Sequence, residues 1–276
     1  MNKIGIMQGR LTLRPENEKR LQFFPPDWQK EFKVAREMGF DCIEWLLDWE
    51  EFEKNPILSE SGVEEIRAVS RASGIETLSM CSDYFMKYPL VGRDPVQVVN
   101  RELIPQMQYA AKIGQNLILI PLLEDHAVKS EGEKQKIISV ITQALNGMRD
   151  NTLRIAFETE LPVNELIDFV DRFKSPRVGV YYDIGNCTSY GFDCPRDFKM
   201  LGTRVFGVHV KDRKGGSTQS VILGTGDADF EKCFAVLSEI GYNGTYILQA
   251  WRSDDYLGDA KRQLEFVREI LKKHES

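Results

Sequence analysis

The sequence predicts an α/β protein whose strands and helices form a single (β/α)8 TIM barrel. Strand-like and helix-like segments alternate along the 276 residues, eight of each, and no linker, low-complexity tract or change in composition interrupts them. Alternating units of this kind imply a parallel sheet with right-handed crossovers, and eight of them close into a barrel. The length suits one domain spanning residues 1–276. The main alternative is an open doubly wound sheet, but it calls for a glycine-rich phosphate loop after an early strand, which the sequence lacks.

The expected strands are short apolar runs next to turn residues. Ile4–Gln8 ends at Gly9, and Asp41–Trp45 begins soon after Gly39, which ends the first helix. Asn116–Leu122 is almost continuously apolar, as expected of a strand that is covered on both faces. The eight expected strands span residues 4–8, 41–45, 76–81, 116–122, 153–158, 178–183, 205–210 and 246–250.

Helices are expected where apolar residues recur at helical spacing between recognisable end signals. Asp27–Met38 has Gly39 as its stop, and Ser61–Ser73 opens with Ser-Gly-Val-Glu, a capping-box pattern. Pro162 lies near the first turn of another helix, where its missing N–H costs no hydrogen bond. The eight expected helices span residues 27–38, 61–73, 95–113, 131–148, 162–173, 195–201, 229–240 and 255–273.

Composition and charge restrict the function classes. Hydrophobic residues make up 42% of the chain and charged residues 28%, and the formal net charge is −6 with scattered Lys and Arg. A nucleic-acid partner calls for a basic stripe, so we expect none. The N-terminus lacks a long apolar signal segment, and the longest apolar run, Leu117–Leu123, is too short to span a bilayer. We therefore expect a cytoplasmic protein without a membrane partner, whose five irregularly spaced cysteines are reduced thiols.

Four predicted strands in the second half of the chain each end with a polar residue that is able to bind a cation. These residues are Glu158, Asp183, His209 and Gln249. Because the carboxyl ends of the strands meet at one face of a barrel, we expect the four side chains to surround one divalent metal. Carboxylate, imidazole and amide donors together suit Mn²⁺, Mg²⁺, Co²⁺ or Zn²⁺.

Each of the four residues also has a structural explanation when it is taken alone. Asp183 is able to cap the turn that follows it, His209 to be a satisfied barrel histidine, and Gln249 to have a structural role. Glu158 is harder to explain in this way, because an unpaired carboxylate is costly to bury. Their shared position at strand ends favours the metal site.

Six segments, in order along nearly the whole chain, carry a resemblance to a known family. They are Gly5–Leu11, Gly39–Trp45, Phe157–Glu158, Tyr182–Asn186, Val208–Asp212 and Leu223–Phe230. Together they resemble the sugar phosphate isomerase/epimerase superfamily of xylose isomerase-like TIM barrels. The likeness is greatest to its hexulose-phosphate isomerase and pentulose-phosphate or keto-sugar 3-epimerase branch. The resemblance implies a sugar or sugar phosphate as substrate and a role in carbohydrate metabolism, and relatives of this kind are often homo-oligomers.

By this resemblance, the metal ligands are Glu158, Asp183, His209 and Gln249, and the substrate contacts are Asn186, Lys211 and Arg213. In the epimerase branch, the first and fourth ligands are both glutamates, which remove and return a proton on opposite faces of the sugar carbon. This chain departs from that pattern, because position 249 is Gln. An amide oxygen binds a cation more weakly than a carboxylate and takes no proton near neutral pH. A two-base epimerisation is therefore in doubt, whereas a one-base proton shift needs only Glu158.

Further residues are candidates for the same site. A second carboxyl group is available from Glu44, Glu160 or Asp254, although Glu160 is also explained as a solvated loop acid. We expect Glu44 and Trp251 to contact the substrate. In the loop over residues 223–230, two glycines either bring backbone N–H groups to a phosphate or form a turn into the next helix.

The leading hypothesis is a metal-dependent isomerase or epimerase of a keto-sugar or its phosphate. Glu158 moves a proton at the carbon next to the carbonyl, while the metal stabilises the enediolate oxygen. One base and one metal also suffice for a lyase that dehydrates a polyol or keto-acid. A sugar-binding barrel that has lost its activity through Gln249 is a further alternative. Endonuclease chemistry of related barrels uses a histidine-rich metal cluster, and this chain has three histidines.

Overall fold

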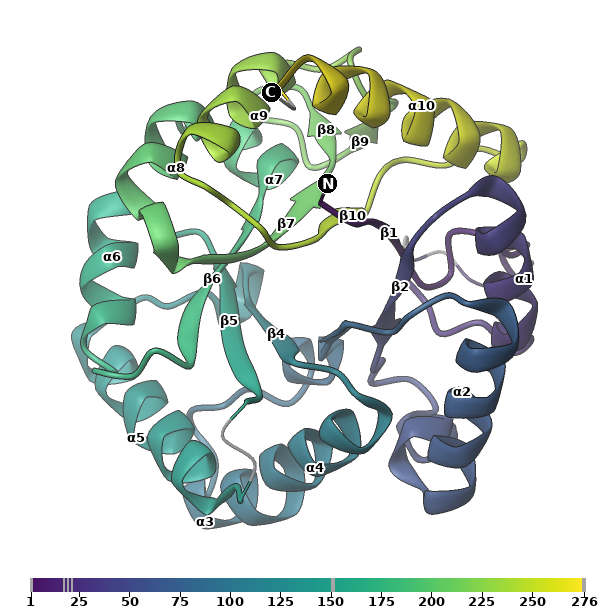
Figure 1. The fold of residues 1–276 in the computed structure, drawn as a ribbon. Coiled ribbons are helices and arrows are strands. Elements are labelled where there is room, and N and C mark those ends of the chain that lie inside the picture. Colours follow the sequence, from purple (N-terminus) through teal and green to yellow (C-terminus); the bar gives the residue numbers. More distant parts are fainter. Residues whose placement is uncertain (1, 17, 19, 21, 150–151, 275–276) are drawn as a thin grey trace. The chain divides into compact units, whose positions relative to one another are not determined.

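The computed structural model describes residues 2–16, 18, 20, 22–149 and 152–274. Within these residues, eight parallel strands close into a barrel, with helices between them along the chain (Figure 1). Around the barrel the strands follow one another in the order β1, β10, β7, β6, β5, β4, β3 and β2. This confirms the predicted (β/α)8 TIM barrel.

The strands agree closely with the expected ones, except that β3 and β10 are shorter; β10 ends at Leu248, so Gln249 lies just beyond it. The barrel strands are β1 (Ile4–Met7), β2 (Cys42–Leu46), β3 (Ser79–Cys81), β4 (Leu117–Leu122), β5 (Arg154–Thr159), β6 (Val178–Asp183), β7 (Val205–Val210) and β10 (Tyr246–Leu248). A separate antiparallel pair, β8 (Asp212–Arg213) and β9 (Ser220–Val221), follows β7.

The helices also follow the expected pattern, with two differences. The helix expected at residues 95–113 contains a π-helical stretch, Val98–Leu103, which ends just before Pro105. Proline has no N–H, so the α-helical hydrogen bond from residue 105 to the carbonyl four residues earlier is missing. Helix α7 was not expected at all. The helices are α1 (Trp28–Met38), α2 (Glu60–Ser73), α3 (Pro95–Gln97), α4 (Ile104–Ile113), α5 (Glu131–Gly147), α6 (Val163–Asp171), α7 (Ile184–Ser189), α8 (Cys194–Leu201), α9 (Phe230–Glu239) and α10 (Tyr256–His274).

By their internal contacts, the residues group into two compact units. Unit 1 comprises Met1–Glu44 and Val180–Ser276, and unit 2 comprises Trp45–Gly179. The division between them falls within β2 and within β6. The expectation of one domain over residues 1–276 stays a prediction.

In unit 1, the strand register brings functional candidates together. Asp183 at the end of β6 is paired with His209 of β7, and His209 is paired with Ile247 of β10. Two residues earlier on the same strands, Tyr181 is paired with Gly207. A Cβ atom on Gly207 would lie 2.4 Å from the Tyr181 ring, so this position has room only for glycine. The pairing therefore buries a tyrosine ring directly beneath the level of Asp183 and His209.

In unit 2, β4 and β5 are paired along their whole length, with Pro121 next to Glu158. Phe157 packs against Phe169 of α6, with 5.4 Å between the ring centroids. Because side chains alternate along a strand, Glu158 points to the face of β5 opposite this helix. Trp45 is fully buried, and its indole N–H donates a hydrogen bond to Asn55 at 3.0 Å, as a core residue does.

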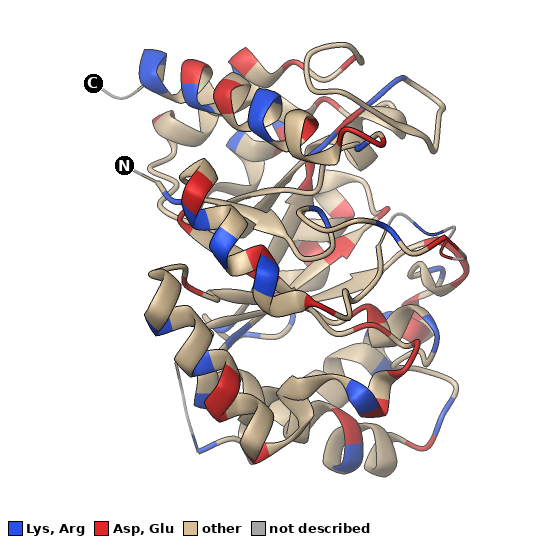
Figure 2. Ribbon diagram, turned by 90° about the vertical axis from the view of Figure 1, so that its right-hand side faces the viewer, with Lys and Arg blue, Asp and Glu red and all other residues tan. Residues whose placement is uncertain are grey.

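Charged residues of both signs are interspersed along the helices and loops (Figure 2). The five cysteines are buried, and none of them forms a disulfide. None of the helices in the described part of the chain combines the length and the apolar character needed to cross a bilayer.

Candidate metal centre

Asp183 stands where β6 gives way to α7. Its Oδ1 accepts the backbone N–H of Asn186 at 2.8 Å and so caps the helix. A Cβ atom on Gly185 would lie 2.8 Å from the Lys211 backbone, so glycine is needed for α7 to start this close to β7. Asp183 Oδ1 thus has the capping role that was one of the two sequence interpretations, and Asp183 Oδ2 faces Lys211 and His209.

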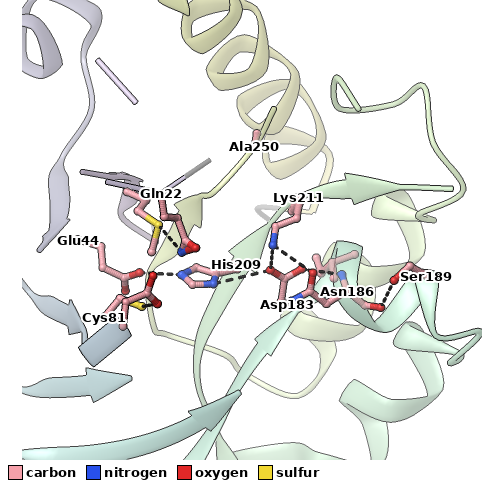
Figure 3. A network of polar contacts seen from close by, with 12 residues as sticks. Gln22, Glu44, Cys81, Asp183, Asn186, Ser189, His209, Lys211 and Ala250 are labelled. Carbon is pink, nitrogen blue, oxygen red and sulfur yellow. Dashed lines mark hydrogen bonds and ion pairs between the residues drawn. The ribbon is translucent and has the colours of Figure 1, made fainter. Parts of the chain in front are cut away.

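Lys211 is the nearest cationic side chain to Asp183. Its Nζ lies 2.7 Å from Asp183 Oδ2 and donates a hydrogen bond to Asn186 Oδ1 at 3.1 Å (Figure 3). Burial alone raises the pKa of Asp183, but the Lys211 ammonium, the His209 ring and the Asn186 N–H outweigh it. The pKa of Asp183 therefore lies below its ordinary value. Asp183 is held as a carboxylate, which is the form that binds a cation.

His209 is completely buried, and carboxylates flank both of its ring nitrogens. Nε2 lies 2.7 Å from Glu44 Oε1, and Nδ1 lies 3.8 Å from Asp183 Oδ2 (Figure 3). The other oxygen of Glu44 accepts the hydroxyl proton of Tyr181 at 2.6 Å. Glu44 is therefore engaged by two side chains, and Tyr181 joins the site although the sequence did not single it out. Strand parity would have been the signal, since Tyr181 shares a face of β6 with Asp183.

Two ligand atoms of unit 1 lie close enough together to bind a single ion. Asp183 Oδ2 and His209 Nδ1 are 3.8 Å apart, and both side chains are buried. In unit 2, the carboxylate of Glu158 on β5 is also buried. Gln249 follows β10, and in the described part of the chain its buried Oε1 accepts no hydrogen bond. A buried acceptor without a donor is costly unless a cation satisfies it. Oxygen and nitrogen donors of this kind fit a divalent metal ion.

The remaining substrate candidates differ in their surroundings. Asn186 is buried, and its side-chain oxygen accepts the bond from Lys211. Arg213 lies on β8, and its buried Nε makes no hydrogen bond within the described residues. Trp251 is half-buried just beyond β10, and its carbonyl accepts a bond from Gln263 at 3.0 Å. Among these three substrate candidates, Arg213 is the one with a buried side-chain donor, Nε, that lacks an acceptor within the described residues.

The glycine-containing loop before α9 is filled by a carboxylate of the protein itself. The backbone N–H groups of Gly224 and Gly226 donate to Asp212 Oδ2 at 2.9 and 2.8 Å, and that of Ala228 donates to Oδ1 at 3.2 Å. Burial raises the pKa of Asp212, although these donors oppose the shift. A Cβ atom on Gly226 would lie 2.1 Å from Asp212. Of the two sequence interpretations, the structure favours the turn, because these N–H groups already bind Asp212.

Glu160, which was weighed as a second acid, accepts the backbone N–H of Glu124 at 2.7 Å. This contact agrees with its interpretation as a loop acid. Asp254, the other alternative, is exposed. Neither residue is as deeply buried as Glu44, which is 0% exposed.

The chain is similar to curated sugar-phosphate epimerases. It is 24% identical over 258 residues to L-ribulose-5-phosphate 3-epimerase UlaE of Shigella flexneri serotype 5b, with 89% of this chain and 90% of the relative covered. It is 26% identical over 234 residues to the enzyme of the same name from Salmonella heidelberg, with 81% and 82% covered.

Solved structures share the fold. A D-psicose 3-epimerase from Clostridium cellulolyticum, solved with D-tagatose, superposes with a TM-score of 0.76 at 17% identity, covering 98% of this chain and 99% of that one. An IolI protein with a bound zinc atom gives a TM-score of 0.74 at 15% identity, with 99% of each chain covered.

A family model described as xylose isomerase-like TIM barrel matches residues 32–270, which is most of the chain. Its span includes all four expected ligands. The chain therefore belongs to the xylose isomerase-like TIM barrel family.

Proposed function

We propose that this protein is a divalent-metal-dependent epimerase or isomerase of a keto-sugar or keto-sugar phosphate. The observation that carries the proposal is the closeness of Asp183 Oδ2 and His209 Nδ1, which lie 3.8 Å apart where β6 and β7 are paired. The names of the similar enzymes, which are 3-epimerases of a pentulose phosphate and of a ketohexose, support the substrate class. A role in the cytoplasm remains part of the proposal.

The metal ligands in this proposal are Glu158, Asp183 and His209, with Gln249 as the weaker fourth. When bound, the ion polarises the substrate carbonyl and stabilises negative charge on its oxygen. Asp183 is suited to its role because its pKa is lowered, so it keeps its charge at neutral pH. The orphaned Oε1 of Gln249 offers a neutral donor.

Glu158 is the proposed base. Its carboxylate takes the proton from the carbon next to the carbonyl, and the electron pair of the broken C–H bond forms the C–C double bond of an enediolate. Return of that proton to the neighbouring carbon, together with passage of the hydroxyl proton from one enediolate oxygen to the other, gives an isomerisation in which one carboxylate serves both carbons. Epimerisation instead needs a proton on the opposite face of the same carbon, which Gln249 cannot deliver. The sequence difference at 249 thus makes same-face transfer the simpler reaction for this chain.

The substrate is expected to contact Asn186, Lys211, Arg213 and Trp251. Lys211 is buried and cationic, which suits a hydroxyl or oxyanion of the sugar. Arg213 has a buried donor without an acceptor in the described chain, which suits an anionic group such as a phosphate.

The test is proton exchange in D2O. The metal-free protein is given Mn²⁺ and then a panel of ketopentoses, ketohexoses and their phosphates, and proton NMR follows the loss of the proton next to the carbonyl. We expect exchange and product with at least one ketose, and none in Glu158→Gln. Failure of every ketose and ketose phosphate to exchange would overturn the proposal. Ultraviolet-absorbing dehydration products would instead identify a lyase.

A further inference from the structure

A buried polar chain of three side chains lies within unit 1. Glu44, Tyr181 and His209 are 0%, 1% and 0% exposed. Glu44 Oε2 accepts a hydrogen bond from the Tyr181 hydroxyl at 2.6 Å, and Glu44 Oε1 lies 2.7 Å from His209 Nε2. With both of its oxygens engaged in this way, the Glu44 carboxylate is an acceptor at each end.

This arrangement determines which nitrogen of His209 carries a proton. A neutral imidazole has one N–H, and the acceptor at Glu44 places that N–H on Nε2. The lone pair is then on Nδ1, which is the nitrogen that faces Asp183 Oδ2 at 3.8 Å. A ring in the opposite tautomer would direct a lone pair at the Glu44 oxygen and an N–H toward the proposed metal.

The backbone explains why these three groups meet. Tyr181 and Asp183 share one face of β6, while Gly207 and His209 share one face of β7. Because Gly207 has no side chain, the Tyr181 ring occupies its place, and the ring centroids of Tyr181 and His209 are 4.5 Å apart. The tyrosine thereby packs on the imidazole and bonds to the carboxylate that the imidazole contacts.

We propose that Glu44 and Tyr181 are positioning residues, which hold His209 in the Nε2–H tautomer with Nδ1 directed to the metal. Glu44 then acts on the histidine and does not contact the sugar. Carboxylates that bond the second nitrogen of a ligating histidine fix its ring and raise its basicity, and their loss costs roughly 10–100-fold in metal affinity. The tautomer itself concerns the metal-free protein, whereas the effect on metal affinity rests on the proposed function.

The tautomer is measured by long-range proton–nitrogen NMR on metal-free protein labelled with ¹⁵N-histidine. The chain has only three histidines, and a His209→Gln variant identifies the signal. We expect the Nε2–H form in the wild type and a mixture of tautomers in Glu44→Leu. A wild-type His209 in the Nδ1–H form would overturn the inference, whether or not the protein binds a metal or turns over a sugar.

Calorimetric titration with Mn²⁺ gives the second measurement. We expect Glu44→Gln to bind Mn²⁺ roughly 10–100-fold more weakly, and Tyr181→Phe to bind it several-fold more weakly while its ring keeps the packing. The matched control is Tyr182→Phe, which removes a hydroxyl from the next position of β6 that bonds to Asp197 at 2.8 Å on the other face of the strand. This control should bind Mn²⁺ like the wild type. Equal affinities in Glu44→Gln, Tyr181→Phe and the wild type would contradict the positioning role.

A wild type that binds no Mn²⁺ at all would instead contradict the proposed function, and the tautomer measurement would still decide the inference. Circular dichroism melts show whether each variant is folded, and Tyr181→Phe keeps the test open if a change at the fully buried Glu44 prevents folding.

Discussion

Gln249 is the residue at which the chain differs from the two-glutamate pattern of the epimerases it resembles. Its orphaned Oε1 is neutral, whereas a carboxylate at the same position would add a negative charge and a proton carrier. We expect Gln249→Glu to bind Mn²⁺ about tenfold more tightly, which corresponds to ~1.4 kcal/mol, and to increase proton exchange in D2O. Calorimetry and NMR measure the two effects. Gln249→Leu is the control and should bind less tightly; unchanged affinity in both variants would mean that residue 249 is not a ligand.

Lys211 would compete with a bound metal ion for the carboxylate of Asp183. Its Nζ lies 2.7 Å from Asp183 Oδ2, so a divalent ion that binds this oxygen meets a neighbouring positive charge. We expect Lys211→Met to raise the affinity for Mn²⁺ several-fold while it lowers the catalytic efficiency. Lys211→Arg keeps the charge and should bind Mn²⁺ like the wild type. A weaker affinity in Lys211→Met would show that the ammonium holds Asp183 in place for the metal.

At the scale of single residues, the sequence was informative about positions and less so about partners. Asp183 and His209 could be brought together in advance, because parallel strands end on one face of the barrel. The contacts of Glu44 could not be predicted, because they depend on which residues of β2, β6 and β7 lie at the same height in the barrel. The packing of the Tyr181 ring over Gly207 likewise depends on the strand register, which no short sequence pattern predicts.

Among the elements, the connection between β1 and α1 depends on one buried acid. Glu31 in the first turn of α1 is 1% exposed, and its carboxylate accepts the N–H groups of Gly9 and Leu11 at 2.8–3.0 Å. Arg252, beyond β10, donates to the carbonyl of Gly9, and Arg10 donates to that of Ala250 at 3.3 Å. The carboxylate therefore holds a loop at the carboxyl end of β1.

Glu31 should give the protein a pH-dependent stability. Burial raises its pKa to about 7, even though the N–H donors and two arginines oppose this. A raised pKa means that the folded state holds the proton more tightly than the unfolded state. The contribution to the free energy of unfolding is thus largest in acid and falls as pH rises from about 4.5 to about 7, by about 3 kcal/mol in total.

Urea unfolding between pH 5 and pH 8 tests this dependence in the wild type and in Glu31→Gln, which resembles the protonated acid. We expect a flatter dependence in the variant. Glu37→Gln, an exposed change in the same helix, is the control and should leave the dependence unaltered. Parallel curves for the wild type and Glu31→Gln would show that Glu31 does not titrate in this range.

Element positions could be predicted wherever an apolar run or a stop residue was present, as with Gly39 and Gly114. Helix α7 could not, because it is six residues long and starts directly from the capping carboxylate of Asp183. The π-helical stretch before Pro105 also escaped prediction, since the residue that causes it lies within an otherwise regular helical pattern.

For the molecule as a whole, the barrel was predictable because the sequence has eight alternating units and lacks the glycine-rich phosphate loop that an open doubly wound sheet calls for. A bound metal ion would stabilise this closed sheet, because the proposed ligands come from separate parts of the chain. Mn²⁺ at a hundredfold excess over its Kd should stabilise the folded state by about 2.7 kcal/mol, provided that the unfolded chain does not bind it. A calorimetric melt with Mn²⁺ and with a chelator measures this, and His209→Gln should lose most of the shift. Equal melting temperatures in wild type with and without Mn²⁺ would contradict a metal held in the folded state.

The pairing of β1 with β10 has a consequence for biosynthesis. Asn2 donates a hydrogen bond to the carbonyl of Tyr242, 240 residues along the chain, and Ile4 is paired with Tyr246. A ribosome adds roughly 5–20 residues per second, so one edge of the first strand waits on the order of ten to fifty seconds for its neighbour. Such an open edge is a template for pairing with other nascent chains. Molecular chaperones that cover this edge during translation would therefore have their greatest effect before residue 246 has left the exit tunnel.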